Sequence, residues 1–169
     1  MSQNLLLMET VDVRRTDDPD DSRVFTLSKF VLPTLKRKTA DHTPGGGVGT
    51  VAHALPMVEA FEPKFSTKGL DLDVMEGLGF SAGQEDKWTF AATLRDKMTR
   101  KLLPARCTIV GVVCEWAPGE HTPGELIDCD HTINEVTYVE FIVGDVHRFT
   151  WSYYGRQWLV GPNKFDIRS

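Results

Sequence analysis

The sequence lacks a long apolar run and an excess of basic residues, and each absence excludes a class of protein. No stretch of about 18 apolar residues, the length a membrane-spanning helix needs, occurs among the 169 residues. Leu5 to Met8 is too short for a signal peptide and has no basic flank, so we expect the protein to stay where it is made, with no membrane partner. The formal net charge of -5 argues against nonspecific adhesion to nucleic-acid phosphates.

Cysteine is scarce, with Cys107, Cys114 and Cys129 too irregularly spaced for a disulfide scaffold or a zinc site. Free, buried thiols are the simplest interpretation. Alternatively, Cys114 and Cys129 flank a turn-rich stretch, and pairing of its arms about the centre would place them opposite each other for a disulfide. Cys107 would then be the odd thiol, which could bridge to a neighbouring subunit under oxidising conditions.

Motifs for catalysis, cofactors or metals are also missing. The glycine cluster at residues 45–49 lacks the Gly-Lys-Ser/Thr ending of a phosphate loop and the strand and helix of a dinucleotide site. The serines lack a nucleophile-elbow context. The histidines show no recognised metal-ligand spacing; they are His42, His53, His121, His131 and His147. We therefore predict no enzyme and no cofactor.

The pattern of apolar residues predicts a mainly β protein in a single domain over residues 1–169. Alternation over residues 88–94 indicates a half-buried strand. Residues 24–32, 107–114, 136–143 and 147–154 also read as strands, with a charged hairpin tip at 14–21 and broken β structure over 51–68. Residues 70–78 suit a short amphipathic helix capped by Gly79. The predicted fold is an antiparallel β-sandwich or open barrel with one flanking helix.

Proline and four glycines between residues 40 and 54 predict a long, pliable loop. Long loops in compact domains are usually functional or disordered, so we expect this one to become ordered against a partner. The residues singled out in it are Asp41, His42, Gly45, Gly46, Gly47 and Gly49.

Acidic residues gather from Glu115 to Glu135 without any Lys or Arg between them. A soluble hairpin is the simpler interpretation. Alternatively, they form an anionic surface that faces the basic segment 36–38 of an adjacent copy, or DNA that must pass without sticking. The residues of this candidate surface are Glu115, Glu120, Glu125, Asp128 and Asp130.

Three blocks, read in order, resemble the major tail tube proteins of contractile-tail bacteriophages. The first is Leu32-Pro33-Thr34-Leu35 with the basic residues and glycines that follow; the second is Val110-Gly111 leading to two Pro-Gly-Glu turns; the third is Val136-Thr137-Tyr138-Val139-Glu140 with Gly144-Asp145. They span roughly residues 30 to 148. The family often closes with a helix, whereas this chain ends in an aromatic segment and a short polar tail.

The resemblance implies a virion protein that assembles in the host cytoplasm as hexameric rings, with a continuous β-barrel closed across the subunits. Stacked rings would form the inner tube of a contractile tail, with the loop near residues 40–54 reaching the next ring. The implied partners are further copies of the chain, a sheath protein outside, and the tape-measure protein and DNA in an anionic lumen. A bacteriocin or secretion-apparatus tube is a close alternative, and a monomeric β-sandwich that binds a ligand is a more distant one.

Overall fold

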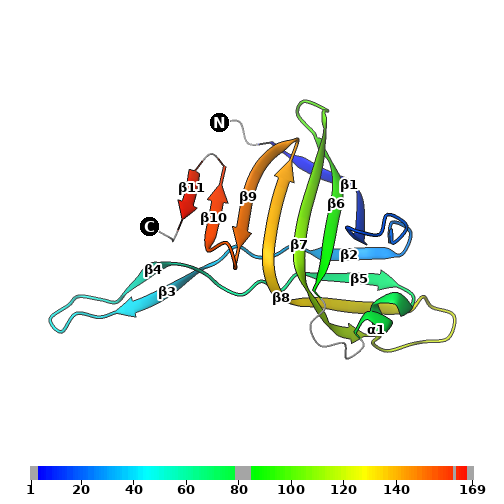
Figure 1. Ribbon diagram of the computed structural model, residues 1–169, viewed down its shortest axis with the longest axis horizontal. Helices are drawn as coiled ribbons and strands as arrows, with labels where there is room; N and C mark the ends of the chain where they lie inside the picture. Colours follow the sequence, from blue (N-terminus) through cyan, green and yellow to red (C-terminus); the bar gives the residue numbers. More distant parts are fainter. Residues whose placement is uncertain (1–3, 79–84, 162, 167–169) are drawn as a thin grey trace.

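The computed structural model describes residues 4–78, 85–161 and 163–166 (Figure 1). They form a nine-stranded antiparallel sheet, a separate two-stranded hairpin and one short helix, which confirms the predicted mainly β class. No helix in this described part is long and apolar enough to span a membrane. The elements are β1 (Leu6–Arg15), β2 (Leu27–Val31), β3 (Arg37–His42), β4 (Val51–Val58), β5 (Lys64–Lys68), α1 (Leu72–Gly77), β6 (Asp86–Asp96), β7 (Leu102–Ala117), β8 (Asp128–Val143), β9 (Val146–Ser152), β10 (Gln157–Val160) and β11 (Asn163–Asp166).

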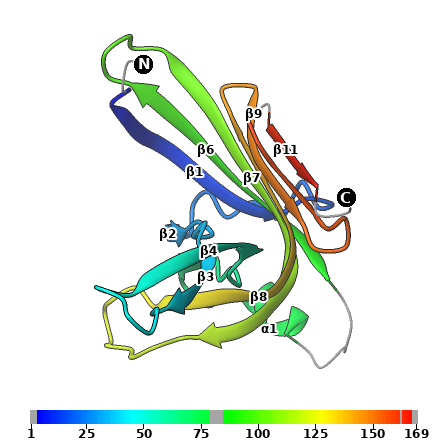
Figure 2. The ribbon, with the colours of Figure 1, turned by 90° about the vertical axis from the view of Figure 1, so that its left-hand side faces the viewer.

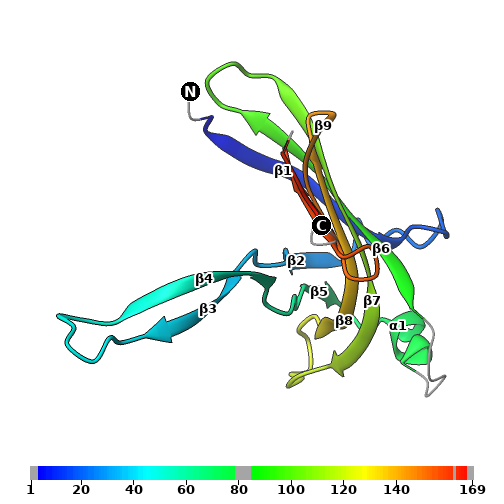
Figure 3. The ribbon, with the colours of Figure 1, turned by 60° about the vertical axis from the view of Figure 1, so that its left-hand side comes forward.

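The large sheet folds over on itself because its two longest strands, β7 and β8, each take part in two layers. The main path runs β1-β6-β7-β8-β9-β10-β11, while β5 pairs with the first part of β8 and carries β2 on its other edge. Figures 2 and 3 show the resulting layers, with β1, β6 and β9 in one and β2 and β5 in the other. The predicted sandwich or open barrel is therefore confirmed.

The bend between the layers lies where the β7–β8 register shifts, just after Val110. A Cβ atom added to Gly111 would lie 2.8 Å from Ile133 Cγ2 and 2.9 Å from the Asn134 carbonyl oxygen, so this close approach requires glycine. On the facing strand Glu135 adopts a left-handed backbone with φ of 52°. A bulge of this kind bends a sheet and increases its twist.

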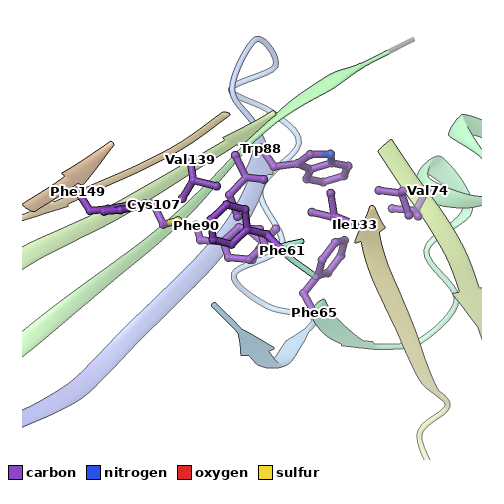
Figure 4. Close-up of a cluster of buried hydrophobic side chains, with 12 residues drawn as sticks. Phe61, Phe65, Val74, Trp88, Phe90, Cys107, Ile133, Val139 and Phe149 are labelled. Atoms are coloured by element: carbon purple, nitrogen blue, oxygen red, sulfur yellow. The ribbon is translucent and has the colours of Figure 1, made fainter. Parts of the chain in front are cut away.

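Large side chains from both layers meet inside the bend (Figure 4). Trp88 and Phe90 point to the same side of β6, as the alternation predicts. The ring of Phe65, from β5 in the other layer, lies 5.4 Å from Trp88 and 6.2 Å from Phe90, measured between centroids. Ile133 and Val139 of β8 complete this centre and are fully buried. One apolar core therefore holds the two layers together.

Several expected boundaries differ from the structure. The predicted hairpin tip at residues 14–21 is wrong, because β1 pairs with β6 and β2 pairs with β5. β2 begins only at Leu27, and β9 ends at Ser152, before the exposed Tyr153. The helix is confirmed but shorter; Asp71 caps it and Val74 is its one buried residue. The predicted cap, Gly79, lies outside the described residues.

The predicted long loop at residues 40–54 is also wrong in part. β3 and β4 pair as antiparallel strands, from Arg37 opposite Val58 to His42 opposite Val51, and only residues 43–50 form the tip. Pro56 lies within β4, near a shift in register, where a strand of a two-stranded sheet tolerates the missing N–H donor. The glycine cluster thus forms the tip of a β-hairpin.

Candidate assembly surface

The β3–β4 hairpin projects from the layered body (Figures 1 and 3); β3 and the tip are exposed throughout, and in β4 only Leu55 and Val58 are partly buried. Asp41 and His42 close β3, and the four predicted glycines lie in the tip. The hydroxyl oxygens of Thr43 and Thr50 are 2.6 Å apart and join the two ends of the tip. Between them, Val48 is fully exposed. An isolated two-stranded hairpin is marginally stable in water, so this arm needs support at its base or from a partner.

The base of the hairpin has such support. The Glu59 amide donates to the Lys36 carbonyl oxygen at 2.8 Å, which continues the pairing toward the body. The Arg37 guanidinium lies over the Trp158 ring, 5.6 Å from its centroid. Beyond β4, Phe61 contacts Trp151 edge-to-face, with centroids 5.0 Å apart. These contacts to β9 and β10 fix the direction in which the hairpin leaves the body.

The N-terminal edge of the large sheet is the second candidate surface. β1 and β11 end the strand order, so each presents one edge without a neighbouring strand within the described chain. The start of β1 and the residue before it, Leu5 to Met8, are apolar, and each of these four side chains is between 44% and 66% exposed. An apolar edge strand of this kind is a template for pairing with another chain. Phe25, in the segment between β1 and β2, is almost completely exposed as well.

The five predicted anionic residues lie at one end of β7 and β8 and in the loop between them, and all are exposed. Part of this charge is already engaged. Asp128 forms an ion pair with Lys68 at 2.5 Å, Asp130 accepts a hydrogen bond from the Ser66 hydroxyl, and Glu115 accepts one from Thr132 at 3.1 Å. Lys68 of β5 thus offsets part of this charge, and an anionic surface facing a partner stays a prediction.

The three cysteines do not lie as the disulfide hypothesis requires. Ala117 pairs with Asp130, so the β7–β8 pairing is not centred midway between Cys114 and Cys129, and Cys129 instead lies opposite Thr67 of β5. Cys107 is buried, and burial raises the pKa of its thiol to about 12. The odd thiol is therefore inaccessible, and Cys114 is the exposed one.

A buried ion-pair network connects the segment before β2 to the helix. The Arg23 side chain is 5% exposed and contacts both Asp21 and Asp71. Its guanidinium also lies over the rings of Trp88 and Phe65. Burial alone would lower the pKa of Arg23, but its hydrogen bonds to the two carboxylates outweigh this and raise it. Buried, reciprocal pairing of this kind serves the fold rather than catalysis.

His131 lies next to this network in the core. The ring is fully buried, stacks on Phe65 at 4.7 Å between centroids, and approaches the Thr67 hydroxyl at 3.4 Å through Nε2. Its Nδ1 has no hydrogen-bond partner among the described residues. Burial lowers the pKa of His131, although the Asp71 carboxylate opposes the shift. Burial thus favours the neutral form of His131 in the core.

Sequence reasoning missed two features of the structure. Arg23 gave no signal, because a single arginine near acidic residues is normally solvated. His42 and His53, which lie on different strands, come together across the hairpin with ring centroids 6.4 Å apart. Among the described residues, no group of three or more His, Cys, Asp or Glu side chains could hold a metal ion.

The described residues thus combine two packed β layers, a projecting hairpin and an apolar sheet edge without a neighbouring strand. The chain belongs to the phage tail tube protein FII family, whose model matches residues 20–151. This family is structural, and membership in it supports a role as a tube subunit. A comparison with curated protein sequences found no match.

Solved structures share the fold at low sequence identity. The PVC sheath/tube terminator of an extracellular contractile injection system, in its extended state, gives a TM-score of 0.55 at 10% identity, covering 79% of this chain and 93% of that one. The PVC sheath-tube complex gives 0.52 at 9% identity, covering 79% and 88%. A chain of the anti-feeding prophage baseplate gives 0.51 at 12% identity, covering 84% and 94%.

Proposed function

We propose that this chain is the building block of a tail tube, in which six copies form a ring and rings stack inside a contractile sheath. The tube would conduct DNA and the tape-measure protein, in a virion whose tail is assembled in the host cytoplasm. The observation that carries the proposal is the projecting hairpin on a chain of the tail tube family. A long exposed arm is costly to order in a monomer and is explained by a neighbour that covers it.

Ring closure would use the edges of the large sheet. β1 and β11 lie at opposite ends of the strand order, so pairing between the edges of two copies is a heterologous contact, which closes a ring when the rotation permits. It would also cover the apolar start of β1, which would otherwise favour uncontrolled aggregation. A barrel continued across subunits removes free edges altogether.

Contacts between stacked rings would lie at the two ends of the long axis of the molecule. The hairpin lies at one end of this axis, and the loop between β7 and β8 lies at the other, on the same side as the segment between β1 and β2, which contains the exposed Phe25 (Figure 1). An apolar tip and an exposed aromatic side chain at opposite ends suit head-to-tail contact between rings. Aromatic side chains are frequent anchors of such interfaces.

A tube of a phage-like bacteriocin or secretion apparatus is the close alternative, favoured by the likeness to contractile injection systems. A monomeric ligand-binding module is the distant one. The feature that favours it is an open, mostly apolar groove of about 380 Å³ at the hairpin base, lined by Pro56, Met57, Trp151, Tyr153 and Trp158, among others.

The first test is negative-stain electron microscopy with light scattering over a range of concentrations, because association follows mass action. We expect hollow rings with sixfold symmetry, and tubes at high concentration. A monomer that persists even when preformed tail initiators are added would contradict the proposal and favour the binding module.

A hairpin variant tests the stacking contact separately. Val48→Asp places a charge on a fully exposed side chain, so the fold should be unaffected while stacking is blocked and rings remain. Val146→Asp, at the half-exposed apolar residue that begins β9, is the matched control and should still form tubes. Normal tubes from Val48→Asp would exclude the hairpin tip from the stacking contact.

A further inference from the structure

The hairpin carries two histidines on the same face. Ala40 pairs with His53 and His42 pairs with Val51, so the two histidines are diagonal neighbours across the strands. Residues of antiparallel strands in this relation project from one side of the sheet, within reach of long or aromatic side chains. Their ring centroids are 6.4 Å apart, with the ring planes inclined by 43°.

This separation is close to that of two imidazoles bound to one metal ion. With Zn–N bonds of about 2.0–2.1 Å, the centre of each ligating ring lies roughly 3 Å from the metal, so two centres are about 5 to 6 Å apart. Both histidines are exposed, and a closure of about 1 Å is within the rotamer freedom of surface side chains. No hydrogen bond involving either ring is found among the described residues, so metal binding has no such contact to break.

The chemistry of the pair selects the class of metal. Imidazole nitrogen suits zinc, copper and nickel, whereas magnesium and calcium require oxygen ligands. Asp41 directly precedes His42 in β3. Because successive strand residues point to opposite faces, Asp41 projects to the other side of the hairpin. Two protein ligands thus leave coordination positions for water or for a side chain of another molecule.

We propose that His42 and His53 form a two-imidazole binding site for a divalent transition metal ion, which clips β3 to β4 below the hairpin tip. Such a clip lies within three residues of Thr43 and of Thr50, which join the ends of the tip. It would limit separation of the two strands, since no other strand or sheet packs on this part of the hairpin among the described residues. Because binding requires the paired strands, the ion would stabilise the folded hairpin over its open states. Both ligands come from one chain, so binding does not depend on tube assembly.

Isothermal titration of the untagged protein with ZnCl₂ and NiCl₂ tests the site, with MgCl₂ as the negative control ion. We expect one ion per chain, at least tenfold weaker binding for both His42→Ala and His53→Ala, and no further loss in the double variant. His121→Ala, in an exposed loop outside the hairpin, is the matched control and should bind as the original chain does.

Circular dichroism of each variant checks that the fold is intact. The non-stacking Val48→Asp variant should retain metal binding, which separates this inference from the proposed tube function. Unchanged affinity in both hairpin histidine variants, or loss of binding in His121→Ala alone, would overturn the proposal. Absence of zinc and nickel binding by the original chain would overturn it as well.

Discussion

The hairpin and the layered body are both antiparallel β structure, yet they obtain their stability in different ways. Every residue of β3 is exposed, whereas β6 and β8 contribute fully buried side chains to one core. In the body, removing a side chain leaves a cavity or an unpaired charge. In the hairpin, removing a side chain changes only the exposed surface and leaves no cavity. The comparison teaches that the body determines the fold, while the hairpin is free to be specialised for contact.

The largest effect is expected for Arg23→Ala. This change removes the guanidinium that contacts both carboxylates, so Asp71 loses its cation while Asp21 keeps Arg15 at 3.7 Å. Breaking a buried pair of this kind costs about 3–5 kcal/mol. Urea unfolding at a concentration where the protein is monomeric measures it. The matched control is Lys36→Ala at the hairpin base, which loses an exposed pair with Glu59 and should cost less than about 1 kcal/mol. Equal losses would contradict the distinction between body and hairpin.

Gly111→Ala should come next. The added methyl group would meet Ile133 and the Asn134 carbonyl at the bend, and overpacking typically costs about 1–3 kcal/mol. Gly45→Ala in the hairpin tip is the control, since nothing lies within 4 Å of the added carbon. Thermal unfolding of the two variants compares them. A stable Gly111→Ala protein would show that the bend can open without loss.

The pH dependence of stability should come from the body as well. Because burial lowers the pKa of His131 below its ordinary 6.5, the unfolded chain binds its proton first as the pH falls. The contribution of His131 to the free energy of unfolding should therefore be complete well above pH 6.5 and decrease progressively as the pH falls below that value. Burial raises the pKa of Asp71, but the hydrogen bond and charge of Arg23, with the hydrogen bond from the Val74 amide, together outweigh it and lower this pKa, which adds a second loss of stability below the ordinary value of 3.8.

Denaturant unfolding at several pH values between about 7.5 and 5, which bracket the ordinary histidine pKa, measures the loss of stability that comes from His131. His131→Gln should be less stable but should lose the slope just below pH 6.5. His121→Gln, at an exposed loop histidine, should keep the slope. A His131→Gln protein with an unchanged slope would assign the pH dependence to other groups.

The smallest effect on stability is expected for Val48→Asp, the variant that should block stacking. Its side chain is fully exposed in the monomer, and substitutions at such positions usually change stability by less than about 0.5 kcal/mol. Differential scanning calorimetry of the monomer measures it. A large loss would mean that the tip packs on the body in solution.

Sequence patterns were informative where burial is one-sided. The alternation around Trp88 and Phe90 predicted β6 as a half-buried strand. The Val- and Ile-rich runs predicted parts of β7 and β8, because dense β-branched residues favour buried strands. β3 has the sequence Arg-Lys-Thr-Ala-Asp-His and gives no such signal, since both of its faces are exposed. Glycine-rich residues beside it therefore predicted a loop in place of a hairpin.

Local patterns could not supply the register. The turn between Cys114 and Cys129 suggested that the cysteines face each other, but the arms pair with Ala117 opposite Asp130, and β5 pairs with β8 at Cys129. The same holds for Arg23, which is buried because segments distant in sequence converge on it. Such outcomes depend on contacts between elements, which spacing along the chain does not record.

By itself, then, the sequence determined the mainly β class and, through its resemblance to tail tube proteins, the family, because strand periodicity and family motifs are local. Only the tertiary structure decided that β7 and β8 bend around Gly111 into two layers, that residues 37–58 form a projecting hairpin, and that His42 lies beside His53. These features follow from which strands pair and in which register, and the free energy that selects a register comes from side chains far apart in the chain.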